Sequence, residues 1–349
     1  MIIFTNQYKN KMKYFFIIYL VIISLLFSCN HNHLDVDISD INLEPLKVMR
    51  LDEDLFSINY ENFDLKSKYL DEKYGQFYNR FLINSIHLNG IEDSLYKPQV
   101  LSFVNDKDIN EANKYIKKIY SDAYFDELTQ NTTECVKRFK YHFPKKPTPK
   151  NIITCVTGWN YSMAYSDNSL IIGLDMYLGD TAKFYRMLNL PKYQTKNFTK
   201  DHILPDMMRA WLLTEFDNSE PINTLINHTI FYGKLYYALN ALLPNTADSL
   251  IFSYSEKQIK YCTKYEKQLW GYFAEKNRLY ENDLKILREL TSDGPFTGAI
   301  SKDCPPRIAM WVGWQIVKSY MKNNKLVTLS DLMNETDAQK ILSKSKYRP

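Results

Sequence analysis

The chain has 349 residues and a formal net charge of +4 at pH 7, with 45% hydrophobic and 24% charged residues. A chain of this length can bury a sizeable core, as one large domain or two smaller ones. Three of the excess positive charges lie among the first 13 residues. The remainder is close to neutral, which excludes nucleic-acid binding driven by bulk charge.

Residues 1–28 are predicted to be a targeting segment. Lysines at positions 9, 11 and 13 precede an apolar run, 14–27, that is too short for an ordinary membrane-spanning helix. The run ends in Leu-Phe-Ser-Cys, which resembles a bacterial lipoprotein signal and makes Cys29 the lipidated first residue of the mature chain. A buried helix with a stray cysteine is the alternative. Removing residues 1–28 takes away three lysines and no acid, so the net charge falls from +4 to +1.

The next part of the chain is predicted to change from a polar tether to helices. Residues 29–44 are mostly polar and read as a tether, and 45–56 begin with strand-like character, which suggests an edge strand of a sheet. Apolar residues recur at helical spacing in 69–82 and 108–143, the second range forming one or two amphipathic helices. Residues 144–149 contain three prolines and end this region. They are predicted to separate a helical part from a sheet within one domain, 45–349.

The stretch from residue 152 to 185 is predicted to hold the sheet. Its β-branched and apolar runs 152–156, 161–164 and 170–174 read as three short strands, with 166–169 as the turn before the third. Three such strands cannot bury both faces alone. Helices from the flanking segments are therefore expected to cover them.

Asp175 follows the third of these strands directly. An aspartate in that position is a candidate functional carboxylate, although aspartates also cap turns, and capping is the favoured interpretation. Asp167 and Asp180 lie nearby and could complete a carboxylate pair for glycoside chemistry. Turn formation is the default for all three.

After residue 199 the chain is predicted to be almost entirely helical. Ser255 and Gln258 have the spacing of a capping box, and Pro305 and Pro306 precede the last aromatic-rich helix. The predicted helices span residues 199–216, 221–243, 255–273, 283–290 and 307–321.

Several catalytic signatures do not occur in the sequence. It has no Walker loop, no dinucleotide-binding glycine pattern, no G-x-S-x-G elbow and no C-x-x-C pair. Four cysteines remain after Cys29 and could pair in three ways. Buried free thiols are favoured because Cys155 and Cys262 lie within apolar patterns.

Five motifs together resemble one known family. They are IGLDMYLG at 172–179, LPKY at 190–193, YGKLYYALNALLP at 232–244, WVGWQIVKSYM at 311–321 and SKYRP at 345–349. In this order, and with the lipoprotein signal, they resemble the gliding-motility lipoprotein family GldB of Bacteroidetes-type bacteria. The resemblance covers nearly all of the mature chain. It implies a cell-envelope lipoprotein, with a palmitate-type anchor, tied to gliding and to the associated secretion machinery, and it implies no known reaction.

A fainter likeness connects the chain to zinc peptidases with an H-E-x-x-H helix. His228 to Tyr232 would be the corresponding stretch, with Glu266 as a downstream acid, but Thr229 and Tyr232 replace the general base and the second ligand. The likeness therefore predicts no bound zinc and, at most, a pseudoenzyme.

These observations predict an α+β fold, predominantly helical, with a small sheet around residues 150–175, and leave a degenerate zinc-peptidase-like fold open. The predicted function is binding rather than catalysis, at the periplasmic side of a membrane, with envelope proteins as partners, no cofactor and no nucleic acid. The alternative is a lipid-anchored periplasmic hydrolase, acting on peptides or glycans. Asp175, His228 and Glu266 are the candidate functional positions, and a deep polar cleft lined by all three would favour the hydrolase.

Overall fold

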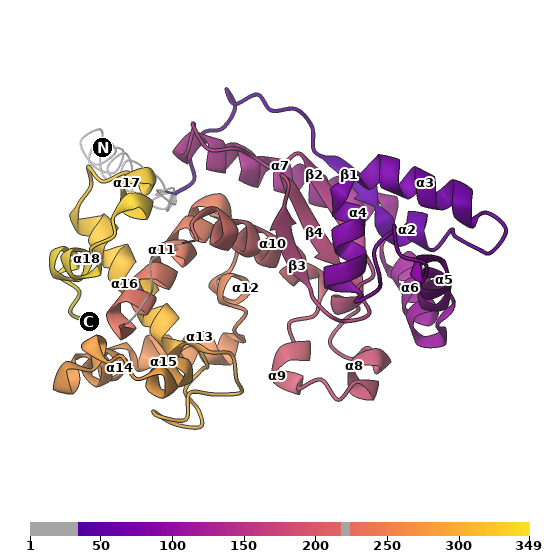
Figure 1. Ribbon diagram of the computed structural model, residues 1–349. Coiled ribbons are helices and arrows are strands. Elements are labelled where there is room, and N and C mark those ends of the chain that lie inside the picture. Colours follow the sequence, from indigo (N-terminus) through magenta and orange to yellow (C-terminus); the bar gives the residue numbers. More distant parts are fainter. Residues whose placement is uncertain (1–33, 218–223) are drawn as a thin grey trace, which may run out of the picture. The chain divides into compact units, whose positions relative to one another are not determined.

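A mixed sheet of four strands lies at the centre of the N-terminal half of the fold (Figure 1). Its order is β1 (Lys47–Arg50), β2 (Asn151–Cys155), β4 (Ser169–Gly173) and β3 (Met163–Ser166). β1, β2 and β4 are parallel, whereas β3 is antiparallel to β4. A two-residue turn joins β3 to β4, and both of its residues, Asp167 and Asn168, have positive φ. Asp and Asn tolerate this conformation, which matches the twist of a hairpin.

The computed structural model describes residues 34–217 and 224–349, without the side chains of residues 276 and 277. The predicted signal peptide and Cys29 lie outside the described residues, as does the expected helix start at Pro221. Contacts join residues 37–349 into one unit. The α+β, predominantly helical class is confirmed, and so is the edge strand expected in 45–56. The three central strands are also confirmed, each shifted by one or two residues.

The N-terminal helices cover one face of the sheet. Ile153, Cys155 and Ile171 alternate along β2 and β4 and pack into one buried cluster with these helices. Leu51, Leu70 and other large apolar side chains of the helices complete the cluster. The helices concerned are α2 (Leu51–Leu55), α3 (Phe63–Tyr74), α4 (Gln76–Arg80), the π-helix η1 (Phe81–Ser85) and α5 (Tyr96–Asn105).

Helices from later in the chain cover the opposite face. α10 (Lys200–Glu215) packs against β3 and β4, and α7 (Asp122–His142) packs against α10. The Trp211 ring of α10 lies 4.2 Å from the Phe139 ring of α7. All five residues of β4 are buried, as expected for a strand covered on both faces.

The remaining elements are short connections and a C-terminal group of helices. α6 (Lys107–Ile119) precedes α7, and Ser121 caps α7, so the helical pattern of 108–143 forms two helices. The expected helix through residue 273 is interrupted at Tyr265, although its capping box is confirmed. The other elements are η2 (Leu174–Met176), α8 (Lys183–Met187), α9 (Lys192–Thr195), α11 (Leu225–Leu242), α12 (Asp248–Phe252), α13 (Glu256–Lys264), α14 (Glu266–Ala274), η3 (Glu275–Tyr280), α15 (Leu284–Thr291), α16 (Ile308–Asn323), α17 (Leu329–Asn334) and α18 (Ala338–Ser345).

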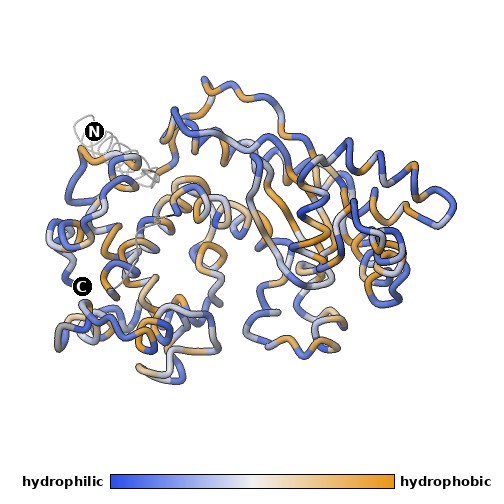
Figure 2. The backbone as a smooth tube through the Cα atoms, viewed as in Figure 1, coloured by the Kyte–Doolittle hydropathy of each residue, from blue (hydrophilic) through white to orange (hydrophobic). Residues whose placement is uncertain are grey.

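α11 and α16 form the centre of the C-terminal group. Hydrophobic residues are interspersed with hydrophilic ones along both helices in Figure 2, and most residues of each helix are buried. They cross at Gly233 and Gly313, where a Cβ atom on Gly313 would lie 1.8 Å from the Thr229 carbonyl oxygen. Only glycine permits this close approach of two helix backbones.

Two further findings concern the described residues as a whole. Cys135, Cys155, Cys262 and Cys304 are free and buried, which confirms the expected thiols at 155 and 262. No helix in residues 34–217 or 224–349 combines the length and apolar character needed to cross a membrane.

Candidate functional site

Asp175 lies just beyond the carboxyl end of β4 and is completely buried. Its Oδ1 accepts a hydrogen bond from the Thr157 backbone N–H at 3.0 Å, and its Oδ2 accepts one from the Trp159 N–H at 2.6 Å. The Thr157 hydroxyl is 3.2 Å from both oxygens. The carboxylate therefore holds the loop that follows β2.

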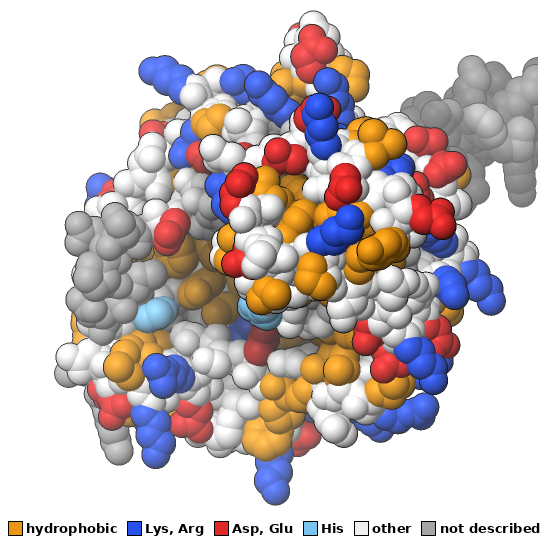
Figure 3. All heavy atoms as spheres, turned by 45° about the vertical axis from the view of Figure 1, so that its right-hand side comes forward, with side chains coloured by type: hydrophobic (Ala, Val, Ile, Leu, Met, Phe, Trp, Pro, Cys, Tyr) orange, Lys and Arg blue, Asp and Glu red, His pale blue; other side chains and the backbone are white. Residues whose placement is uncertain are grey.

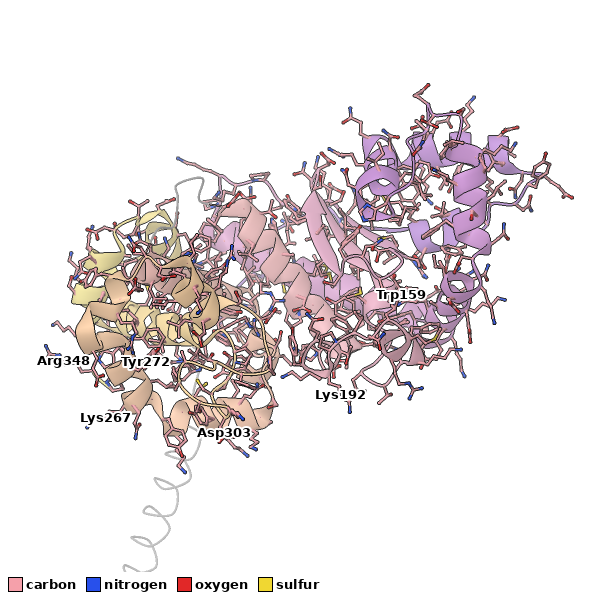
Figure 4. All side chains as sticks on the ribbon, turned by 60° about the horizontal axis from the view of Figure 1, so that its bottom comes forward. Trp159, Lys192, Lys267, Tyr272, Asp303 and Arg348 are labelled. Carbon is pink, nitrogen blue, oxygen red and sulfur yellow. The ribbon has the colours of Figure 1, made fainter. Side chains whose placement is uncertain are left out.

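The electrostatics of Asp175 reflect this position. Burial raises the pKa of Asp175 to about 6, and hydrogen bonds from Thr157 and Trp159 oppose that rise. Trp159 has a positive φ, and its ring stacks on Phe184 at 5.5 Å; Figure 4 places Trp159 beside the sheet. Protein donors therefore occupy both carboxylate oxygens of Asp175.

A second buried carboxylate, Asp52, was not singled out by the sequence analysis. It follows β1 as Asp175 follows β4, and it accepts hydrogen bonds from the Arg50 guanidinium and the Thr154 hydroxyl. Arg50 in turn lies over the Phe125 ring, 4.1 Å from its centroid. The ion pair of Arg50 and Asp52 thus connects β1 and β2 with α7. In the sequence, the only indication of this role was the position of Asp52 just after a predicted strand.

The three candidate positions do not meet in one cleft. Asp175 is fully buried after the end of β4. His228 lies half-buried on α11, with its ring parallel to that of Tyr232 at 6.5 Å. Glu266 lies in the first turn of α14 and accepts a hydrogen bond from the Tyr347 hydroxyl at 2.8 Å. The arrangement that would have favoured a hydrolase is therefore not formed by these residues.

Five other charged residues do converge, and we call their site the charged cleft. The cavity has a volume of about 380 Å³ and is lined by Lys196, Asp206, Arg209, Asp293 and Arg307, together with residues 160–163, which lead into β3. Figure 3 shows a hollowed part of the surface where basic, acidic, histidine and hydrophobic side chains meet. The size lies within the range of about 300–1,000 Å³ that is usual for ligand sites.

Ion pairs and hydrogen bonds position the charges of the cleft. Arg209 Nη2 donates to Asp206 Oδ1 at 2.8 Å, and the Tyr177 hydroxyl donates to Asp206 Oδ2 at 2.9 Å. Arg307 lies 2.8 Å from Asp293 Oδ1 and also donates to the Phe252 carbonyl oxygen at 2.7 Å. The Asp293 side chain is 67% exposed, so its pairing with Arg307 contributes little stability and stays open to competition.

Lys196 contributes the third positive charge. Its Nζ donates to the neutral amide oxygen of Gln258 at 3.0 Å. Burial lowers the pKa of Lys196, Arg307 lowers it further, and Asp293 opposes both. Among the described residues, no carboxylate is therefore closely paired with the Lys196 ammonium.

A smaller space, which we call the apolar compartment, adjoins the charged cleft. It has a volume of about 230 Å³ and shares Arg209, Asp293 and Arg307 with the cleft. The other side chains around it are mainly leucines and tyrosines from α10 and α11, together with Met310 of α16: Leu212, Leu213, Tyr232, Leu235, Tyr236 and Leu239.

The helix that packs on the sheet carries a pattern that the sequence analysis did not single out. His202 and Asp206 of α10 are four residues apart, the spacing at which helical side chains can share a metal ion. Ile203 occupies the position that the general base has in H-E-x-x-H. Both Asp206 oxygens already accept protein donors, and no cluster of three ligand-type side chains occurs in the described part of the chain. The candidate of the sequence analysis, His228, lies instead on α11, which packs mainly against α16.

Sequence reasoning could not find the charged cleft because its charges come from separate segments. Lys196 follows α9, Arg209 lies in α10, Asp293 follows α15 and Arg307 caps α16. Each is an ordinary charged residue in its local pattern. The local feature that could have pointed to the cleft was the position of Arg307 directly after Pro305 and Pro306.

The comparisons with known proteins gave one match. A family model described as gliding motility protein GldB matches residues 31–349, nearly the whole chain. No curated protein and no solved structure matches significantly.

Proposed function

The chain belongs to the GldB family of gliding-motility lipoproteins, and we propose that it serves the motility machinery by binding a ligand in the charged cleft, without catalysing a reaction. We further propose that a lipid on Cys29 holds it at a membrane, on the periplasmic side, among envelope proteins of the gliding and secretion apparatus. The observation that carries the binding function is the cleft itself, in which arginine, lysine and aspartate side chains are fixed next to an apolar compartment.

The charges in the cleft support binding over proton transfer. An acid–base catalyst needs a titratable group free to exchange a proton with the substrate. Asp206 accepts donors on both oxygens, and His202 has its Nδ1 2.9 Å from the Thr199 hydroxyl. Burial lowers the pKa of His202, Asp206 and Asp201 oppose this, and Arg209 and Lys196 add to it. A lipid-anchored hydrolase remains the alternative function, and His202 with Asp206 would be its acid–base pair.

Two substitutions separate the alternatives in a gliding assay. His202→Gln removes the proton-transferring ring and keeps a polar side chain next to Thr199. We expect gliding to persist, because binding does not require this proton transfer, whereas loss of a general acid or base would lower a rate by about 10²–10⁴-fold. Gly294→Trp places a large ring at the wall of the cleft, where a Cβ atom has 3.7 Å to its nearest neighbour. This variant should abolish gliding.

Gly294→Ala is the matched control for obstruction and should glide normally. Immunoblots of membrane fractions verify that each variant is present and anchored. Normal gliding of Gly294→Trp would contradict a role for the cleft. Loss of gliding in a folded, anchored His202→Gln protein would favour the hydrolase.

The anchor is tested by Cys29→Ser. Lipid attachment at this position supplies acyl chains that contribute about 0.8 kcal/mol per buried methylene, enough for stable membrane attachment when two or more chains are present. We expect the variant to remain unprocessed or to leave the membrane fraction, and gliding to be lost. Metabolic labelling with a radioactive fatty acid measures the modification directly, and undiminished labelling of Cys29→Ser would reject this site.

A further inference from the structure

The charged cleft and the apolar compartment share three lining residues, Arg209, Asp293 and Arg307. A ligand that occupies both spaces has to join a polar part to an apolar part. The chemistry of the two spaces therefore defines the two parts of that ligand.

The balance of charge specifies the polar part. Lys196, Arg209 and Arg307 carry three positive charges at neutral pH, against two negative charges on Asp206 and Asp293. Arg209 and Arg307 each have an aspartate at 2.8 Å, whereas Lys196 donates to an amide oxygen. α16 also begins directly after Arg307, so the positive end of its dipole is near the same place. One anionic group, such as a carboxylate, would neutralise the surplus charge.

The volume of the apolar compartment specifies the apolar part. A cavity of about 150 Å³ lined by aliphatic and aromatic side chains accommodates benzene. At about 230 Å³ this compartment suits one aromatic or branched aliphatic side chain. A long acyl chain would extend out of it into the polar cleft, where burial of methylenes gives no comparable gain.

The wall of the cleft suits a peptide backbone. Tyr193 and Gln194 present hydroxyl and amide groups along it, beside Ser162 and Met163 at the start of the edge strand β3. Such side chains donate and accept hydrogen bonds, as peptide groups require. A bound peptide whose terminal carboxylate lies at Lys196 would place its last side chain near Arg307 and the apolar compartment.

From these features we propose that the cleft captures the carboxyl terminus of a partner protein. The terminal carboxylate lies against Lys196 and Arg307, and a large apolar last side chain enters the apolar compartment. The proposal rests on the binding function proposed above and specifies its ligand. Capture of a C-terminal carboxylate is an established mode of peptide recognition.

Fluorescence anisotropy with defined peptide pools tests the proposal on the full-length lipoprotein in detergent. The probes are labelled, degenerate octapeptides that end in Leu, Phe, Ser or Lys, each prepared with a free carboxylate and as a carboxamide. We expect the Leu and Phe pools to bind at least tenfold more tightly as carboxylates than as carboxamides. The Ser and Lys pools should bind weakly in both forms.

Three variants test separately the contact with the terminal carboxylate and the contact with the last side chain. Lys196→Met should remove the tenfold preference for the carboxylate. Lys192→Met, which alters an exposed lysine at the lower edge of the molecule in Figure 4, should keep it. Leu213→Asn changes a half-buried wall of the apolar compartment and should weaken only the Leu and Phe pools.

Two results would overturn the proposed ligand. One is equal binding of the carboxylate and carboxamide pools. The other is binding of octanoate, a carboxylate without peptide groups, by a protein that binds none of the pools. If Gly294→Trp nevertheless abolishes gliding, the cleft would keep its proposed role and only the chain terminus would be rejected.

Discussion

Gly313→Ala should be the most destabilising single substitution proposed for this protein. The new Cβ atom would lie 1.8 Å from the Thr229 carbonyl oxygen and 2.7 Å from its carbonyl carbon. These are backbone atoms of a buried helix, so no side-chain rotation relieves the overlap, and α11 and α16 have to separate. Overpacking in a core costs about 1–3 kcal/mol, occasionally more. We expect a loss above about 3 kcal/mol, a large fraction of the 5–15 kcal/mol typical of a folded domain.

Urea denaturation followed by circular dichroism measures this loss. Gly271→Ala is the matched control, because Gly271 also lies inside a helix, α14, and a Cβ atom there meets nothing within 4 Å. Replacing an unobstructed helical glycine by alanine should stabilise the protein by about 0.5–1 kcal/mol. A Gly313→Ala protein with an unchanged denaturation midpoint would show that the helices are not in this close contact.

Asp175→Asn should also destabilise the protein, although the sequence suggested a mild effect because Asn caps a turn about as well as Asp. Both Asp175 oxygens accept backbone N–H groups, at 3.0 Å from Thr157 and 2.6 Å from Trp159. An asparagine has one oxygen, so its NH₂ group must face one of these donors. A buried donor without its acceptor costs about 1–3 kcal/mol. We expect a loss near the upper end of that range.

The same denaturation experiment checks this prediction, with Asp180→Asn as the control. Asp180 is exposed and close in sequence, so its substitution should change stability by no more than about 0.5 kcal/mol. If Asp175→Asn unfolds at the wild-type midpoint but loses gliding, the carboxylate would have a functional role that its buried hydrogen bonds do not suggest.

Local patterns in the sequence determined the elements of the fold. β-branched and apolar runs predicted β2, β3 and β4 because strand preference depends on neighbouring side chains. Ser255 and Gln258 predicted the start of α13 because a capping box needs only residues three apart. The ordered motifs also determined the family, which the match over residues 31–349 confirms.

Local patterns did not determine the strand order or the partners of Asp175. Its position after a strand was visible, but the donors Thr157 and Trp159 reach it only because β2 and β4 are neighbours in parallel pairing. Parallel strands require a crossover, so their pairing depends on contacts between distant parts of the chain. For the same reason Gly233 and Gly313, 80 residues apart, showed no sign in the sequence of facing each other.

The charged cleft depends most completely on tertiary structure. Lys196, Arg209 and Arg307 are each unremarkable in their own segments, since an isolated lysine or arginine usually marks a solvated surface. They line one cavity because the segment after α9, the helix α10 and the start of α16 meet there. Electrostatic interaction depends on the distance between charges and on the surrounding medium, and neither quantity is encoded in separation along the chain. The sequence therefore determined the elements and the family, and only the tertiary structure decided which charged residues form a site.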